Sequence, residues 1–575
     1  RLQKGRLTDN MASMTLGEDQ IRHRGYTNIG MALMTENPNY STPANSPVGA
    51  AGGAFGAGQT YGDLLGLGAQ RTLTLVNGRR FVSSSTASQF SAVQGSPVDL
   101  ANIPTLLIKK VDVVVGSGGP VYGSDAIAGV QNFILDDDYK GVNLTGQTGF
   151  SQKGDGIDYR LAGKAGTHFD HERGTVVFDV EYNQTFGMTN ADRARWAGTS
   201  DKKLQYTRNQ AGNGYDLSRG SREYLPFTQT GVPGMLGNYG DYPNYQGVAT
   251  GSSITSPAGQ PLIFSQDGRS LVPLRPGTPT GDGFTAVGKK GEMNGFPIGN
   301  YGNLLNDQQR LNLTTLGHYD FTRHLRFTYE AWYVHSAVAN TAAQPYYNTQ
   351  MFDDVFDGPG QPNGAMELST DNPFLTSEVR EILRQNLANA GLPTDKFYLS
   401  RASTDYYKGK YTTTTDLFRF VGGLQGDFNA GHRHFDWKGS FEYGQYRSRT
   451  KQTELLLQNY LNALNAQVDG AGNIVCAPDY TNAAYPAFSQ TCAPLNPFGY
   501  DQASGAARDY IQTSATARSV NQQWDLNADV RSTVMKLPAG DWTYDFGYEH
   551  RFEETSFNPG GLDYNVIIFH IYTPP

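Results

Sequence analysis

Apolar and polar residues alternate with a period of two through much of the chain beyond residue 142. In one such segment Val176, Phe178 and Val180 alternate with Asp179 and Glu181. Successive side chains of a strand point to opposite faces of a sheet, so each segment predicts a strand with one apolar and one charged face. We predict about nine strands, at 142–150, 157–167, 174–185, 309–321, 325–336, 413–428, 433–449, 518–533 and 541–553. This pattern is typical of the wall of a transmembrane antiparallel β-barrel.

The connections between the predicted strands alternate in length. Short links are expected at 168–173, 322–324, 429–433 and 536–540, and long links at 187–308, 337–411 and 450–517. Outer-membrane barrels have short periplasmic turns and long extracellular loops. A soluble β-sandwich also alternates in polarity, but its strands are shorter and such a rhythm is rare in it.

Two helices are predicted inside the long links. Apolar residues recur at helical spacing over 373–390, with Gly391 as a stop signal, and 453–468 is a second candidate. We expect their apolar sides to pack the loops together, although a partner-binding helix is an alternative.

The first 140 residues have a different pattern, which predicts a small α+β unit. Alternating residues at 72–76 lead into Asn77-Gly78, a strong hairpin signal because both residues tolerate positive φ. Residues 79–82 return as the partner strand, and 110–115 and 130–135 are two further strands. A short helix is expected at 104–109, with proline near its start.

The sequence of this region resembles the plug domain of TonB-dependent outer-membrane receptors. The matching pieces are Leu67-Gly68, Arg71-Thr72-Leu73, LVNGRR at 75–80, Val98-Asp99-Leu100, Ile103-Pro104 and YGSDAIAGV at 122–130. Leu65, Lys109-Lys110, Asp112 and Gly118-Gly119-Pro120 depart from the usual family pattern. The resemblance implies a mainly β fold, in which an N-terminal plug domain at 1–140 lies inside the β-barrel portion at 141–575.

Composition and charge fit this interpretation. The 575 residues have a formal net charge of -8, which argues against nucleic acid as a partner. No run of about 18 apolar residues exists, so no transmembrane helix is predicted. Glycine (68), tyrosine (34) and phenylalanine (29) are abundant, as aromatic girdles and glycine-rich loops would require.

The two cysteines, Cys476 and Cys492, both fall in one long link. We expect a disulfide formed outside the cytoplasm, which for a loop of this length stabilises by about 3 kcal/mol. Two free thiols are the alternative, and ligands for a zinc site are absent at suitable spacing.

The ends of the chain suggest a fragment. It opens at Arg1 without an initiator methionine or a visible signal peptide, and residues 566–571 break the alternation. Plugged transporters have about 22 strands, so we expect the C-terminal strands and the N-terminal TonB box to be missing.

No enzyme active site is evident, and we expect no catalytic residue, metal or cofactor. Residues 283–289 match G-x-x-x-x-G-K, but Lys290 stands where a phosphate-binding loop needs Ser or Thr. The flanking strand and helix that such a loop requires are also absent from the prediction. His168, His171, His432 and His434 fall in predicted turns, where solvated histidines are the simpler reading.

The resemblance implies an ion-pair contact between plug and barrel. Its candidates are Arg79 and Arg80 on the plug hairpin, with Glu181, Glu330, Glu442 and Glu549 on the lumen-facing parity of the wall. Arginine binds carboxylate bidentately, and a wet polar contact can be broken reversibly. The alternative is that each glutamate is merely solvated in a polar lumen.

Aromatic residues are the candidates for substrate binding. They crowd two long links, as Tyr239, Tyr242 and Tyr245 in one and Tyr346 and Tyr347 in the other; Gln89 and Phe90 represent the expected plug tip. Aromatic rings stack on a sugar or an apolar ligand, and tyrosine adds a hydroxyl group. Most of these rings could instead pack the loops.

The function implied is that of an outer-membrane receptor of a Gram-negative bacterium that binds a scarce nutrient and imports it. TonB and its inner-membrane motor complex, a small-molecule or oligosaccharide ligand and outer-membrane lipid are the expected partners. Siderophore, cobalamin, oligosaccharide and peptide all remain open as ligands, and so do the oligomeric state and an accessory lipoprotein. A passive porin-like channel and a surface adhesin or binding protein are the alternatives.

Overall fold

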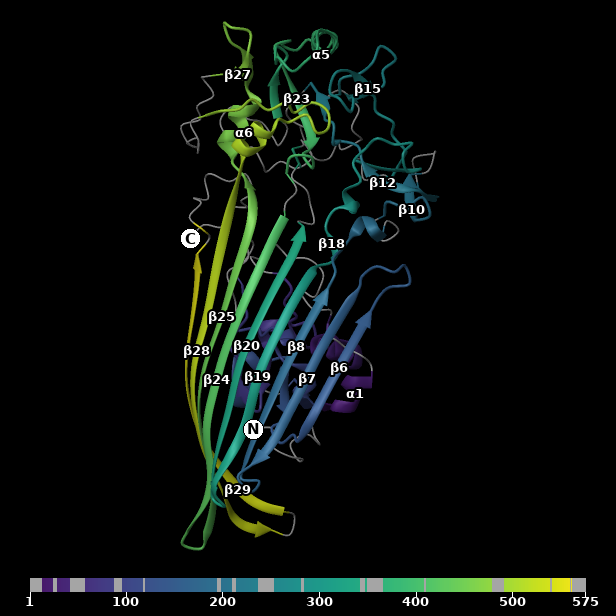
Figure 1. The fold of residues 1–575 in the computed structure, drawn as a ribbon. Helices are drawn as coiled ribbons and strands as arrows, with labels where there is room; N and C mark the ends of the chain where they lie inside the picture. The colour runs from purple at the N-terminus through teal and green to yellow at the C-terminus, as the bar shows by residue number, and fades with distance from the viewer. Residues whose placement is uncertain are drawn as a thin grey trace.

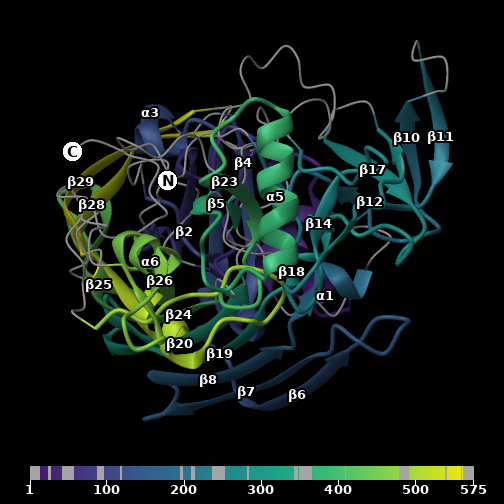
Figure 2. The same cartoon turned by 90° about the horizontal axis from the view of Figure 1, so that it is seen from above.

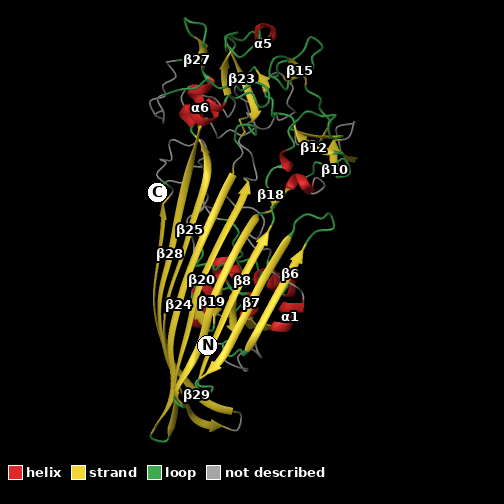
Figure 3. Cartoon of the chain, viewed as in Figure 1, coloured by secondary structure: helices red, strands yellow, loops and turns green. Residues whose placement is uncertain are grey.

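The computed structural model has three parts: a long curved sheet, a small N-terminal unit on its concave side, and a cap above (Figure 1). It describes residues 13–23, 28–41, 57–86, 96–116, 119–193, 198–208, 214–235, 253–280, 284–341, 347–348, 366–407, 410–477, 491–537, 540–558 and 560. Figure 3 shows that helices occur in the N-terminal unit and the cap, whereas the curved sheet consists of strands. Among the described residues, no helix is both long and apolar enough to cross a membrane.

The curved sheet, which we call the wall, contains nine antiparallel strands in the order β29-β28-β25-β24-β20-β19-β8-β7-β6. Their bounds are β6 Gly141–Gly149, β7 Asp158–Phe169, β8 Gly174–Thr185, β19 Asp307–Thr322, β20 Leu325–Thr341, β24 Lys410–Ala430, β25 Arg433–Leu455, β28 Gln512–Leu537 and β29 Gly540–Asn558. All nine predicted strands are therefore confirmed. Several strands are longer than predicted at the end where the long links begin. Their backbones stay paired there, although apolar and polar residues no longer alternate clearly.

The alternation along each wall strand separates two faces. On the convex face Phe178, Trp524 and Phe546 are 55%, 47% and 70% exposed. On the concave face Glu181 and Glu442 are each 1% exposed. The polar side chains are thus buried and the aromatic ones exposed, which is the reverse of a soluble sheet.

The connections differ at the two ends of the wall, as predicted. Short turns join β7 to β8, β19 to β20, β24 to β25 and β28 to β29 at the bottom of Figure 1, which we call the lower end. The long connections leave the opposite, upper end and build the cap.

The N-terminal unit is a five-stranded sheet in the order β1-β4-β5-β2-β3, and we call it the plug. Its elements are β1 Ser13–Gly17, α1 Glu18–His23, α2 Ile29–Glu36, η2 Ala69–Arg71, β2 Thr72–Val76, β3 Arg79–Arg80, η3 Leu100–Asn102, η4 Thr105–Leu107, β4 Ile108–Val115, α3 Gly119–Tyr122, η5 Ser124–Ala126 and β5 Gly129–Leu135. The predicted hairpin is present, with φ of 51° at Asn77 and 78° at Gly78. β2 also pairs with β5 in parallel, a long-range contact that no local pattern announces.

One plug prediction is wrong. The helix expected at 104–109 is a single 3-10 turn, because Ile108 already pairs with Leu135 as the start of β4. β5 ends at Leu135 and β6 begins at Gly141, on either side of the predicted division at residue 140. The division into domains 1–140 and 141–575 stays a prediction.

Figure 2 shows the wall curving around the plug when the molecule is seen from above. One hydrophobic cluster contains plug residues such as Phe81 and Val82 together with wall residues such as Trp332, Leu417 and Tyr446. The plug is therefore packed against the concave face by apolar contacts as well as by polar ones.

The cap is built from three long connections that share one hydrophobic core. Its elements are β9 Met188–Thr189, η6 Asn190–Arg193, β10 Leu204–Arg208, β11 Tyr215–Arg219, β12 Ser221–Tyr224, β13 Val232–Gly234, β14 Leu262–Phe264, β15 Leu271–Pro273, β16 Thr278–Pro279, β17 Thr285–Gly288, η8 Ile298–Asn300, β18 Asn303–Leu305, β21 Tyr347–Asn348, β22 Met366–Ser369, α5 Ser377–Asn389, β23 Lys396–Ala402, α6 Leu457–Leu464, β26 Ala466–Val468, β27 Ile474–Cys476 and α7 Gly505–Ile511. β13 of the first connection pairs with β23 of the second. Contacts within the core tie the third connection to both, so the loops form one folded unit.

The two predicted loop helices have different outcomes. α5 lies inside the predicted 373–390, is capped by the Thr376 hydroxyl and is followed by Gly391 at φ 71°. The prediction at 453–468 is wrong in extent, because β25 continues to Leu455 and β26 begins at Ala466. Only α6, eight residues long, remains between them.

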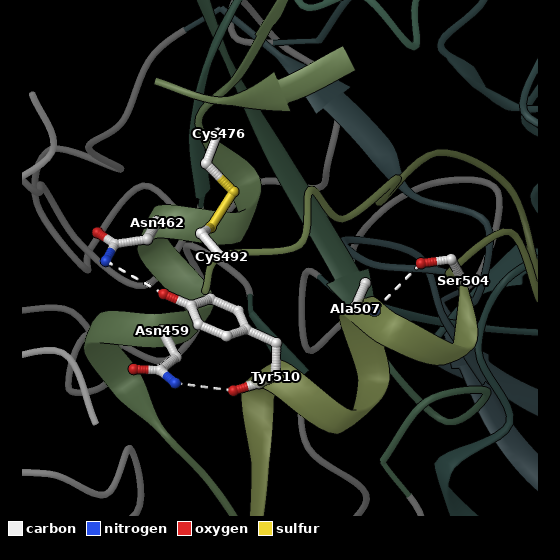
Figure 4. The surroundings of a disulfide bond; sticks show 7 residues. All are labelled: Asn459, Asn462, Cys476, Cys492, Ser504, Ala507 and Tyr510. Carbon is white, nitrogen blue, oxygen red and sulfur yellow. Dashed lines mark hydrogen bonds between the residues drawn. A yellow bond between two sulfur atoms is a disulfide. The ribbon is translucent and has the colours of Figure 1, made fainter. Parts of the chain in front are cut away.

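The predicted disulfide between Cys476 and Cys492 is confirmed, with 6.2 Å between the two Cα atoms. Figure 4 shows it beside α6 and α7. In the same region the Asn459 side chain donates to the backbone oxygen of Tyr510 at 2.8 Å, and the Ser504 hydroxyl caps α7 by accepting from the Ala507 backbone. The disulfide therefore closes a loop against a region that is already packed.

Candidate functional site

Glu330 lies at the centre of the contact between plug and wall. The period-two pattern of β20 turns its side chain to the concave face, where it is 3% exposed. Its carboxylate accepts hydrogen bonds from the Arg79 guanidinium and, at 2.9 Å, from the Asn77 side chain, both on the plug hairpin. The other oxygen accepts from Nη1 of Arg419 on β24 at 2.6 Å. One carboxylate thus joins plug and wall.

Arg419 continues this arrangement along the wall. Its Nε and Nη2 donate to the two oxygens of Glu442 on β25, at 2.9 and 2.7 Å. Its guanidinium also lies 5.0 Å from the ring centroid of Phe81 on the plug. Arg79, Glu330, Arg419 and Glu442 therefore form a row of alternating charges, which we call the central ion cluster.

Arg80 takes part in a separate contact with the last wall strand. It donates to Asp125 within the plug at 2.7 Å, and its Nε lies 3.2 Å from Oε1 of Glu549 on β29. Arg551 on β29 approaches Asp125 to 3.7 Å. The Glu549 side chain is 41% exposed, so solvent screens this pair and it is weaker than the buried ones.

The Glu181 carboxylate binds a backbone amide and the Thr105 hydroxyl of the plug rather than an arginine. Its Oε1 accepts from the Leu106 amide at 2.7 Å, at the 3-10 turn η4. On the wall side it pairs with Arg160 of β7 at 2.8 Å. The structure thus brings all six predicted residues to the plug–wall interface, but in three separate groups.

Sequence reasoning missed Arg419, although it stands on the charged parity of the predicted strand. It also missed a buried ion pair nearer the upper end, between Arg310 of β19 and Asp99 of the plug, at 3.2 Å. Asp99 accepts from the Thr60 and Ala101 amides at 2.8 and 3.1 Å, and so ties two plug segments together. Burial raises the pKa of Asp99, while the charge of Arg310 and the two amides oppose that rise.

Side-chain amides of the wall hold the plug backbone as well. Asn521 of β28 donates to the carbonyl oxygens of Ser83 and Ser85, at 3.1 and 2.9 Å. Arg310 and Gln308 both donate to the Gly58 oxygen. None of these pairs could be assigned from spacing, because their members are hundreds of residues apart.

Most of the residues predicted to bind the substrate cannot be placed. Gln89, Phe90, Tyr239, Tyr242, Tyr245 and Tyr346 all lie outside the described residues. Tyr347 begins β21 and pairs with Ala402 of β23, which places its backbone in the cap. A ligand site built from these residues stays a prediction. Within the described part of the chain, no cluster of His, Cys, Asp and Glu could hold a metal ion.

Comparison with known proteins identifies the plug. Residues 7–130 match the sequence profile of the TonB-dependent Receptor Plug Domain. The resemblance recognised in the sequence motifs is therefore confirmed over this region.

Solved structures similar to the chain include three receptors. The siderophore receptor PiuA from Acinetobacter baumannii is 13% identical with a TM-score of 0.33, and the match covers 95% of this chain and 62% of that one. A variant of the ferric enterobactin receptor PfeA from Pseudomonas aeruginosa, in complex with enterobactin, is 12% identical with a TM-score of 0.34 and coverage of 95% and 59%. The ferric citrate transporter FecA in its unliganded form is 10% identical with a TM-score of 0.37 and coverage of 95% and 57%. The chain thus spans about three fifths of their length.

Proposed function

We propose that this chain, whose residues 7–130 match the plug domain of TonB-dependent receptors and whose wall is part of a β-barrel, captures a scarce nutrient outside the cell for import. The wall would lie in the outer membrane of a Gram-negative bacterium, with the cap outside the cell. TonB and its inner-membrane motor would move the plug, and the ligand would then pass.

The central ion cluster is the observation that best supports this proposal. Transport needs a plug that is held firmly at rest and can still be released without unfolding the wall. Arg79 and Asn77 contact the wall through one carboxylate, Glu330, which Arg419 also holds in place. When the hairpin leaves, Glu330 keeps its pairing with Arg419, so no isolated charge remains buried on the wall. Water can solvate the departing Arg79.

The two alternatives fit the geometry less well. A passive channel needs an open lumen, whereas the plug occupies the concave side of the wall and shares a hydrophobic cluster with it. An adhesin needs no plug with ionic contacts to the wall. The convex row of exposed aromatic residues also favours a lipid environment over a soluble binding protein.

The ligand class is open, because the predicted contacts fall mainly outside the described residues. We propose a small molecule or an oligosaccharide, bound between the cap and the plug tip. Siderophore, cobalamin and oligosaccharide are the candidates. The proposed role includes no catalysis.

Whole-cell uptake with three labelled probes tests the proposal: an iron-loaded siderophore, cobalamin and a maltodextrin. Cells expressing the full-length protein should accumulate one of them, and only when TonB is present. Arg79→Glu should lower that uptake at least tenfold while the amount of protein in the outer membrane is unchanged. Arg80→Glu should have a smaller effect, because its wall partner is half exposed.

Arg269→Glu, at an exposed position in the cap, is the matched control and should transport normally. Equal uptake with and without TonB would instead indicate a passive channel. Uptake of none of the probes would contradict the nutrient classes proposed.

A further inference from the structure

Cationic side chains gather on the convex face of the wall near its upper end. Arg447, Arg449 and Lys451 occupy every second position of β25, and Arg518 lies beside them on β28. All of them are exposed. Side chains of a strand alternate between its two faces, so these residues share the face that carries Trp524. We call them the convex basic patch.

Two charges of the convex basic patch face each other directly. Arg449 and Arg518 are partners in the antiparallel ladder, a position that brings Cβ atoms to about 5 Å and makes like charges destabilising. Asp416 is the partner of Arg447 on β24, but its carboxylate lies 2.8 Å from Nδ1 of His335 instead. Within the part of the chain that the structure describes, no ion pair neutralises a cation of the patch. The repulsion therefore calls for an anion from outside the chain.

The patch begins where the aromatic part of the convex face ends. The convex positions of β25 from Phe435 to Tyr443 are mostly aromatic, and Tyr443 packs against Trp524 with 4.6 Å between the ring centroids. At about 3.4 Å per residue and a strand tilt of about 40°, this stretch covers roughly 20 Å of membrane thickness, close to the ~25 Å apolar band of a barrel. Only Gln445 separates it from Arg447 on this face. The patch thus lies at the level of lipid headgroups rather than of hydrocarbon.

We propose that the convex basic patch binds the phosphate groups of a lipid headgroup in the outer leaflet. Arginine binds phosphate bidentately, so one phosphate between Arg449 and Arg518 turns their repulsion into two attractive contacts. Arg447 and Lys451 lie on either side of that position, so the patch suits a lipid with two phosphates. An acidic protein would have to approach through the lipid that surrounds the wall. This inference rests on the membrane location given under the proposed function.

The patch lies at the root of one part of the cap. β25 continues past Lys451 to Leu455 and leads into α6, while β28 begins at Gln512 directly after α7. Figure 1 shows β25 and β28 rising together to the cap below α6. A phosphate that joins the two strands should therefore hold the base of α6 and α7 in place.

Hydrogen exchange of the full-length protein, purified in a non-ionic detergent, tests this inference. Diphosphoryl lipid A should slow amide exchange in residues 447–455 and 512–518 at least fivefold, whereas fully dephosphorylated lipid A should not. An equal effect of the dephosphorylated lipid would overturn the inference, because acyl chains alone would then protect the strands. The same protection by inorganic phosphate would overturn the assignment to a lipid.

Arg449→Gln with Arg518→Gln should abolish the response to diphosphoryl lipid A. Arg323→Gln with Arg433→Gln removes the same charge from exposed positions at the lower end and is the matched control, which should respond like the wild type. A response that persists in Arg449→Gln with Arg518→Gln would place the lipid elsewhere and overturn the inference.

Lipid phosphate that remains bound during purification gives a second readout, which covers altered folding of the variants in detergent. Protein extracted from outer membranes should carry at least threefold less lipid phosphate per molecule in Arg449→Gln with Arg518→Gln than in the wild type or the control. Equal phosphate in all three proteins would contradict the proposed site. Neither readout requires TonB or a transported ligand, so failure of the uptake experiment would leave both results unchanged.

Discussion

At the scale of single residues, the plug is held by carboxylates that serve two partners each. Glu330 binds Arg79 of the plug and Arg419 of the wall, so its removal leaves the buried Arg419 and the partly buried Arg79 without that partner. Arg419 keeps Glu442 as a partner, whereas Arg79 loses its contact with the wall, so the attachment of the hairpin weakens. We expect Glu330→Ala to raise the rate of hydrogen exchange in residues 72–80 at least tenfold.

Glu381→Ala, on the exposed side of α5, is the control for that measurement and should leave exchange in the hairpin unchanged. The same protection in both variants would show that Glu330 does not hold the hairpin. Glu330→Gln should fall between wild type and Glu330→Ala, because an amide oxygen can still accept hydrogen bonds.

Glu223 in the cap predicts a pH dependence. Burial raises its pKa to about 7, although the Gly295 amide and the charge of Arg275 act in the opposite direction. Between about pH 4.5, the ordinary pKa of glutamate, and pH 7, Glu223 keeps its proton in the folded cap and loses it in the unfolded chain. The free energy of unfolding of the cap therefore falls as the pH rises through this range. The decrease in the free energy of unfolding should reach roughly 3 kcal/mol at most.

Hydrogen exchange of β12 and β17 measured at pH 5 and pH 8 checks this expectation. The wild type should be less protected at pH 8, and Glu223→Gln should remove the difference. Glu292→Gln, in an exposed turn nearby, should keep it. A pH difference that persists in Glu223→Gln would assign the effect to another group.

The residues of the interface were only partly predictable. Strand parity was enough to place Glu330 and Glu442 on the concave face, because it depends on neighbouring positions alone. The pairing of Asp99 with Arg310 joins positions 211 apart in the chain, and no local pattern contains that information. The same is true of Asn521, whose partner lies more than 400 residues away.

At the scale of elements, long strands were easier to predict than the cap. The nine wall strands repeat their alternation over many residues, so each is recognisable alone. The cap strands are often two to five residues long and pair across different connections, as β13 does with β23. The helix expected at 453–468 was predicted too long, because pairing with β28 extends β25 to Leu455 and only α6 is helical.

The disulfide should stabilise one part of the cap and leave the wall unaffected. Replacing both Cys476 and Cys492 by serine should destabilise the region around α6 and β27 by about 3 kcal/mol, as the loop length implies. Hydrogen exchange should increase in α6 and α7 and stay the same in β24 and β25. Faster exchange throughout the wall would mean that the cap and the wall unfold together.

At the scale of the whole molecule, the two faces of the wall require different environments. Its convex face should contact lipid, and its concave face should contact the plug. Burial of Glu181, Glu442 and Asp525 beside exposure of Phe178 and Trp524 follows from this arrangement. The plug packs on the wall through both apolar and ionic contacts, so its removal should change only the concave face.

A nitroxide scan along β25 in outer membranes tests this claim most directly. Labels at positions 437, 441 and 443 should collide with oxygen dissolved in lipid, whereas labels at 442 and 446 should be shielded from oxygen and from a water-soluble nickel reagent. Deleting residues 1–140 should expose positions 442 and 446 to the nickel reagent and leave the other three unchanged. Nickel access at 437, 441 and 443 in the intact protein, or shielded positions 442 and 446 after the deletion, would contradict the account.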